Sequence, residues 1–328
     1  MGAYTLVAVG AGSVARHAEP LACSHFTISG PILGICLPVT SDRQRAYHMP
    51  SLAELDRAML QPGRFVPAVN RLGGGAIAMS DPDRPWRVVG ATAAVYQLRQ
   101  ASGRVLALRC PLSERVGGDP SFAPRYQALG TTPATASLRG QRGPLAHDIT
   151  LYEDGLVLPA AEFRSAVYPV IAMEWITGPT LFEAVVHACQ ISDRRGLKEM
   201  AATWIELISS LRDASFDHGE LTPDNVLLRP NGDLALVDYD SVAWKGSPRP
   251  PARQPEPNYG HPATHATPVG IRDAFPSLII YASMSVLARW PSLHGEFGDP
   301  PGTRGGALLF HARDLANPRQ SPSTKQAW

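Results

Sequence analysis

The sequence predicts an α+β fold with two lobes, a small β-rich N-terminal lobe and a helical C-terminal lobe. Strand-like patterns dominate residues 86–175, and helical periodicity takes over after Gly178. The chain has 328 residues and is 44% hydrophobic, which suffices for one large core or two lobes. Strands first and helices later predict two lobes with a cleft between them.

Residues 1–48 mix Gly, Ser, Pro and His without sustained periodicity, so we expect an irregular or disordered extension there. The character changes at Met49, because Ser51 is followed three residues later by Glu54, a helix-start pattern. We hypothesise that Met49 is the true start and that residues 1–48 are an over-extended gene model. The domains expected after that extension are an N-terminal lobe with a leading helix (49–176), a helical C-terminal lobe (177–320) and a tail (321–328).

Five strands are expected in the first lobe, because β-branched and aromatic residues gather in short runs bounded by turn residues. The second and third runs are joined by a tight turn at residues 101–103 (ASG). In the second lobe, apolar residues recur every three or four positions, which is typical of helices. The strands are predicted at 87–90, 94–98, 105–109, 149–158 and 168–175, the helices at 181–191, 197–211, 273–293 and near Leu308, and a long Pro-rich loop at 245–268.

Charge and cysteine content exclude several classes of partner. The formal net charge of +1 gives no reason to expect nucleic acid or an anionic membrane. No run approaches the roughly 20 apolar residues needed to span a bilayer. The four cysteines form no CxxC pair, which predicts neither a zinc site nor a disulfide framework. The apolar stretch at 4–15 lacks a basic flank and contains Gly10 and Gly12, so we expect a cytoplasmic protein rather than an exported one.

Residues 218–240 (HGELTPDNVLLRPNGDLALVDYD) carry the strongest functional signal. Two short apolar strands run between Asn225 and Asp238 and are joined by an Asn-Gly turn at 231–232. A hairpin would bring its two ends together, and with them an amide oxygen and a carboxylate. Phosphoryl transfer from ATP needs such oxygens to hold a divalent metal, and a further carboxylate near the acceptor hydroxyl.

This segment resembles the protein-kinase signature HRDxxxxN followed by DFG. The resemblance implies ATP and Mg²⁺ as cofactors, Asn225 and Asp238 as metal ligands, and Glu220 at the position of the catalytic base. The spellings HG and DYD are also similar to aminoglycoside and choline phosphotransferases, whose second acidic residue, here Asp240, helps to hold metal. The alternative is a β-hairpin of an unrelated domain in which His218 is a core histidine.

Residues 168–178 (YPVIAMEWITG) look like the hinge strand of a kinase. The resemblance implies that backbone groups near Glu174 and Ile176 pair with adenine and that Met173 stands at the gatekeeper position. The alternative is an ordinary buried strand.

Residues 88–95 (VVGATAAV) fall where a kinase has its Gly-rich loop, and only the middle glycine survives, as Gly90. By resemblance, the positions that sandwich adenine are Val95 and Ala107 above the base and Leu227 beneath it.

The departures from the kinase pattern bear on catalysis. Arg109 stands where the kinase lysine is expected, and arginine is longer, planar and forked. Glu220 replaces the catalytic Asp. Its extra methylene moves the carboxylate by about 1 Å, and a displacement of that size can lower the rate roughly 100-fold. The expected helix glutamate is missing from residues 118–130, which offer Arg125 and Tyr126 instead. Alternatively, Arg109 reflects a chain that has 27 arginines among its 30 basic residues, and Glu220 only braces its loop.

Two functions of different class fit these residues. The first is phosphoryl transfer from Mg-ATP to a protein Ser/Thr hydroxyl, with Glu220 and Arg109 as catalytic residues. The second is a catalytically impaired pseudokinase that binds nucleotide or a partner. A third, a small-molecule kinase of the aminoglycoside phosphotransferase type, would need an acidic surface for a cationic acceptor, and acidic residues are sparse in the helical region. The expected partners are ATP and an unknown protein substrate or partner.

Asp273 resembles the helix aspartate that braces the kinase catalytic loop.

Overall fold

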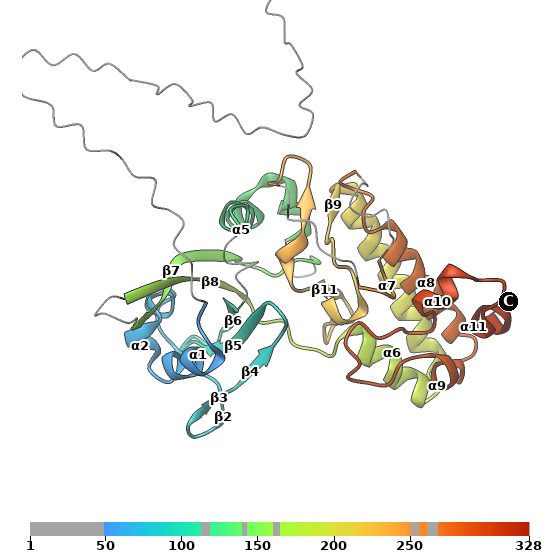
Figure 1. Cartoon of the computed structure of the whole chain (residues 1–328), viewed down its shortest axis with the longest axis horizontal. Helices are drawn as coiled ribbons and strands as arrows, with labels where there is room; N and C mark the ends of the chain where they lie inside the picture. The colour runs from blue at the N-terminus through green and yellow to red at the C-terminus, as the bar shows by residue number, and fades with distance from the viewer. Residues whose placement is uncertain are drawn as a thin grey trace, which may run out of the picture. The chain divides into compact units, whose positions relative to one another are not determined.

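The computed structural model describes residues 49–112, 119–139, 143–159, 165–248, 250, 256–260 and 268–327. All of them belong to one compact unit, residues 46–328. The unit combines a curled antiparallel sheet with several helices, so the predicted α+β class is confirmed (Figure 1). The predicted extension at 1–48 lies outside the described residues.

Three short helices precede the sheet. The first begins after Ser51, whose Oγ accepts from the backbone N–H of Glu54 at 3.3 Å while the Glu54 carboxylate accepts from the Ser51 N–H at 2.8 Å. This reciprocal capping box confirms the predicted helix start. The helices are α1 (Leu52–Met59), α2 (Pro62–Phe65) and α3 (Pro67–Arg71).

The main sheet has six strands in the order β1-β5-β6-β8-β7, with β4 also paired to β5, and every pairing is antiparallel. The five predicted strands are therefore confirmed to within a few residues. Strands β1, β2 and β3 were not predicted, because each is only two or three residues long. The bounds are β1 (Ala76–Ile77), β2 (Met79–Asp81), β3 (Arg84–Pro85), β4 (Arg87–Val89), β5 (Ala93–Arg99), β6 (Val105–Pro111), β7 (Thr150–Pro159) and β8 (Ser165–Glu174).

The sheet divides its side chains between two hydrophobic cores, because alternate residues of a strand point to opposite faces. In β6, Leu106 and Leu108 join a core that includes residues of α1 and α3. Ala107, between them, joins the other core, which continues into the helices that follow the sheet. Arg109 has the same parity as Ala107 and so extends from the face that looks toward those helices.

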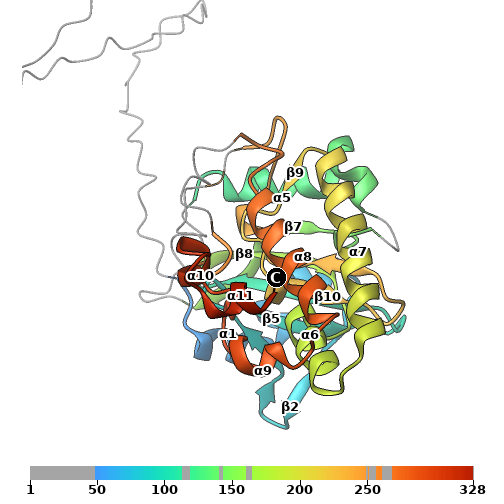
Figure 2. The same cartoon turned by 90° about the vertical axis from the view of Figure 1, so that its right-hand side faces the viewer.

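The C-terminal half is mainly helical. Two long helices, α7 and α8, lie side by side (Figure 2), and the indole N–H of Trp204 donates to the Ser277 carbonyl across them at 3.1 Å. The predicted helices at 181–191 and 197–211 are confirmed as α6 and α7. The helices are α5 (Phe122–Thr131), α6 (Leu181–Gln190), α7 (Arg194–Asp213), α8 (Ala274–Leu287), α9 (Leu293–Phe297), α10 (Ala312–Ala316) and α11 (Pro322–Ala327).

Two helix predictions need correction. The helix predicted over 273–293 ends at Leu287, and α9 begins only at Leu293, beyond Pro291. The short helix predicted near Leu308 is wrong: residues 306–310 are irregular, and α10 begins at Ala312. The backbone here is held by a side chain instead, since the Tyr259 hydroxyl bonds the Gly306 carbonyl at 2.8 Å and the Leu308 N–H at 3.2 Å. Among the described residues, no helix is long and apolar enough to cross a membrane.

Candidate functional site

The hairpin predicted from the motif is present. β10 (Val226–Leu228) and β11 (Leu234–Leu236) pair antiparallel with Val226 opposite Leu236. The Val237 N–H then donates to the Asn225 carbonyl at 2.9 Å, beyond the last strand pair. Asn225 and Asp238 therefore lie at the same, open end of the hairpin.

The loop that precedes the hairpin is held by Asp273, at the start of α8. Its carboxylate accepts from the N–H groups of His218 and Gly219, the latter at 3.0 Å. This confirms the predicted bracing contact. Burial raises the pKa of Asp273 to about 6, although the two N–H donors and nearby His218 favour the ionised form.

Gly219 accounts for the HG spelling of the motif. Its φ is +81°, a left-handed conformation that residues with a side chain rarely adopt. A Cβ added to Gly219 would lie 2.3 Å from the Ser241 carbonyl oxygen, far inside van der Waals contact. The arginine found at this place in the HRD signature would not fit in this loop.

Glu220 is tied to its surroundings by both its backbone and its side chain. Its carboxylate accepts from the Ser241 hydroxyl at 2.7 Å, and its carbonyl accepts from the amide nitrogen of Asn225 at 2.8 Å. Because Asn225 uses its nitrogen here, its oxygen is the atom that a metal would take. The contact with Ser241 fits the bracing role, and Glu220 also lies in the loop next to the hairpin end.

Arg109 reaches the same place from β6. One of its terminal nitrogens, Nη2, lies 3.1 Å from the Asp238 carboxylate, 2.5 Å from that of Asp240 and 3.1 Å from the Thr92 hydroxyl. Arg109 is 4% exposed. Burial raises the pKa of Asp238, and the charge of Arg109 opposes that rise. The strand cation therefore pairs directly with the two acidic residues of the DYD segment.

Asp240 is fully buried and has a partner on each carboxylate oxygen. Oδ1 accepts from the Tyr126 hydroxyl at 2.9 Å and Oδ2 from Arg109, while Arg125 donates to the Asp240 carbonyl at 2.8 Å. Helix α5 thus supplies Tyr126 and Arg125 to the loop, in place of a glutamate for the strand cation. The sequence showed both residues but gave no signal for this role.

The predicted metal ligands differ in how the protein engages them. Asp240 stays a predicted ligand, and each of its carboxylate oxygens accepts from a protein donor, Tyr126 or Arg109. Asn225 and Asp238 fit Mg²⁺, which is commonly held by one or two protein oxygens together with phosphates and water. Asp238 is only half-buried, and within the described residues its carboxylate bonds Arg109 through one oxygen. Among those residues no cluster of three or more His, Cys, Asp or Glu could hold a metal.

The residues predicted to surround adenine share one hydrophobic core. Three are buried and two are half-buried against that core. The strand register places Ala107 opposite Met173, and it places Val95 opposite Arg109. The five residues are Val95 (β5), Ala107 (β6), Met173 (β8), Ile176 and Leu227 (β10).

The two remaining predicted residues have specific contacts. Gly90 closes the β4–β5 turn, where its N–H donates to the Ala93 carbonyl at 2.9 Å. The Glu174 N–H donates to the His147 carbonyl, so it is not the group that would pair with adenine. The Glu174 carboxylate binds Arg229 at 2.6 Å and thereby links the end of β8 to the β10–β11 hairpin, a role that sequence reasoning missed.

No protein-family model matches the chain, and no curated protein is significantly similar to it. Any assignment of function therefore depends on the geometry of the site.

Proposed function

We propose that this chain is a protein-kinase-like, ATP-binding protein that transfers a phosphoryl group from Mg-ATP to a protein Ser/Thr hydroxyl. The observation that carries the proposal is the meeting of Asn225 and Asp238 at the open end of the β10–β11 hairpin, with Arg109 reaching Asp238 from the sheet. Arg109 comes from a segment far from the hairpin in the sequence. Together the three side chains would offer the oxygen ligands and the cation that ATP phosphates require.

Each residue of the site would have its own role in the transfer. The Asp238 carboxylate and the Asn225 oxygen would hold Mg²⁺, which neutralises charge on the phosphates. Arg109 would place a positive charge beside them. Asp240 orients its guanidinium, and Tyr126 in turn donates to the other oxygen of Asp240. Glu220 would orient the acceptor hydroxyl and accept its proton.

A second function, a pseudokinase that binds nucleotide without transferring phosphate, also has a specific observation in its favour. Arg109 is paired with two carboxylates, and Glu220 is bonded to Ser241. Both predicted catalytic residues are thus engaged by protein partners. The small-molecule kinase stays a third prediction, which rests on the HG and DYD spellings of the motif.

Nucleotide binding is the first test. We expect Mg-ATP to raise the melting temperature of the wild-type protein and Asp238→Ala to abolish the shift. Asp233→Ala is the matched control, since it removes a carboxylate from the turn end of the same hairpin. No shift with any nucleotide and metal would overturn the proposal.

Transfer is the second test, with radiolabelled ATP as donor. If Glu220 is the base, Glu220→Ala should lower the rate by about 100-fold or more. An unchanged rate in Glu220→Ala would remove Glu220 from the mechanism. Binding without transfer in wild type, together with transfer gained in Glu220→Asp or Arg109→Lys, would identify a pseudokinase.

A further inference from the structure

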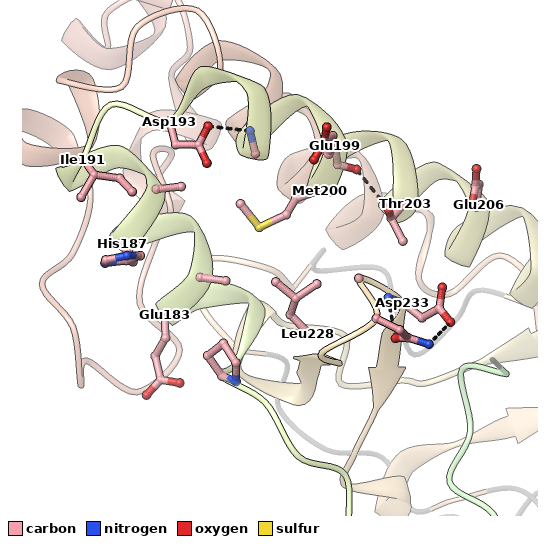
Figure 3. Close-up of a pocket in the computed structure, with 16 residues that line it drawn as sticks. Glu183, His187, Ile191, Asp193, Glu199, Met200, Thr203, Glu206, Leu228 and Asp233 are labelled. Carbon is pink, nitrogen blue, oxygen red and sulfur yellow. Dashed lines mark hydrogen bonds between the residues drawn. The ribbon is translucent and has the colours of Figure 1, made fainter. Parts of the chain in front are cut away.

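A groove of about 790 Å³ runs between α6, α7 and the turn of the β10–β11 hairpin (Figure 3). It includes Asn231, Gly232 and Asp233 of that turn, which is the opposite end of the hairpin from Asn225 and Asp238. The groove is therefore separate from the proposed nucleotide site, and its function is an independent question.

The groove exists because both helices present small residues to it. Ala184 and Ala188 lie one turn apart on α6, and Gly196 and Thr203 lie on the matching face of α7. Side chains this short leave space between the two helices.

The floor of the groove is apolar. Met200 from α7 and Leu228 from the hairpin point into the space between the helices (Figure 3). Ile191, at the end of α6, is 61% exposed beside it, which is unusual for so large an apolar side chain. These residues offer a surface that an apolar side chain of a partner would cover.

The rim of the groove is acidic. Among the described residues that line it, none is Lys or Arg, and five are acidic: Glu183, Asp193, Glu199, Glu206 and Asp233. Helix capping explains two of them, since Glu183 and Asp193 accept from the backbone at the starts of α6 and α7. Glu199 and Glu206 cap neither helix start and are exposed on α7, where the Glu199 carboxylate accepts from the exposed Arg195.

We propose that this groove docks an arginine-containing, partly apolar peptide segment of a partner protein. The acidic rim attracts the cations and steers their approach, and the apolar floor receives the side chains between them. The carboxylates from Asp193 to Glu206 extend roughly 20 Å along α7, at about 1.5 Å per residue. One small cation cannot reach all of them, whereas an extended segment with several arginines can.

The test is fluorescence anisotropy of the full chain with a fluorescein-labelled peptide, Arg-Leu-Arg-Arg-Leu-Arg. We expect it to bind more tightly at low salt than at high salt. A peptide with Glu in place of each Arg should not bind, and one with Ser in place of each Leu should bind more weakly. Failure of the first peptide to bind, or equal binding of the Glu peptide, would refute the docking site.

Charge-reversal variants test whether the peptide binds in this groove. Glu199→Lys combined with Glu206→Lys should weaken the Arg-Leu peptide by about tenfold. Asp81→Lys combined with Asp83→Lys makes the same charge change on the exposed β2–β3 hairpin and should leave the affinity unchanged. Ile191→Ser tests the apolar floor and should weaken binding without altering charge. Unchanged affinity in both groove variants, with wild-type circular dichroism, would overturn the proposal.

Discussion

Arg109, Tyr126 and Asp240 form a buried polar group in the candidate site. A charge removed from water is stable only when it is paired and hydrogen-bonded. Asp240 meets that condition through Arg109 on one oxygen and Tyr126 on the other. Tyr126 therefore positions Asp240, and Asp240 in turn positions the guanidinium of Arg109.

Tyr126→Phe tests that arrangement, since it removes one hydroxyl and keeps the ring. We expect the free energy of unfolding to fall by about 1–2 kcal/mol, because a buried carboxylate loses one of its hydrogen-bond donors. Tyr281→Phe is the control, since Tyr281 is exposed on α8. Urea denaturation measures both variants. Equal stabilities would mean that the Tyr126 hydroxyl contributes nothing to the network.

The raised pKa of Asp273 predicts that the free energy of unfolding depends on pH. Its pKa of about 6 in the folded protein lies above the ordinary value of 3.8 that holds in the unfolded chain. Between these values the folded state keeps a proton that the unfolded state has lost, so this group's contribution to stability falls as pH rises from about 4 to 6. Above that range the contribution is constant.

Asp273→Asn cannot titrate, so the difference in unfolding free energy between wild type and variant should fall by about 1–3 kcal/mol across this interval. Urea denaturation at several pH values measures it. Parallel pH profiles would contradict the assignment.

Among the structural elements, the loop before the β10–β11 hairpin is the most constrained. Gly219 has to adopt a left-handed conformation there and also to admit the Ser241 carbonyl. Gly232, in the hairpin turn, has a similar φ of +88°, but no atom lies within 4 Å of where its Cβ would be. A comparison of the two glycines therefore distinguishes the cost of a left-handed backbone from the cost of a steric clash.

Gly219→Ala and Gly232→Ala form a matched pair. Gly232→Ala should cost about 1–2 kcal/mol, the price of a left-handed residue with a side chain. Gly219→Ala should cost clearly more, because the loop must also move away from Ser241. Thermal and urea denaturation give both values. Equal costs would show that the close approach to Ser241 is absent in solution.

Across the whole described unit, one hydrophobic core joins the sheet to the helices. It contains Ala107 and Met173 from the sheet together with Trp204 and Ile280 from α7 and α8. The ion pair between Glu174 and Arg229 adds a second connection. Neither the sheet nor the helical region can lose its packing without exposing part of this shared core.

We therefore expect the sheet and the helices to unfold together. Far-UV circular dichroism and tryptophan fluorescence should give coincident urea transitions, since Trp86 and Trp175 report on the sheet region and Trp204 on α7. Two separated transitions would show that the shared core does not couple them.

The sequence alone determined the features that depend on local pattern. Periods of two and of three to four residues predicted the main strands and the long helices. The meeting of Asn225 and Asp238 was also predictable, because a short hairpin fixes it. The helix near Leu308 was predicted wrongly, because the Tyr259 hydroxyl, nearly fifty residues away in sequence, satisfies that backbone without a helix.

Only the tertiary structure decided which partners the charged residues have. Arg109 and Asp240 are 131 residues apart, and their contact depends on how the sheet packs against the helical region. The same packing places the Tyr126 hydroxyl against the other carboxylate oxygen of Asp240. The acidic residues of the helical region are sparse along the chain, yet α6, α7 and the hairpin turn gather five of them around one groove. Local periodicity cannot encode such contacts, because they arise from the packing of elements that are distant in sequence.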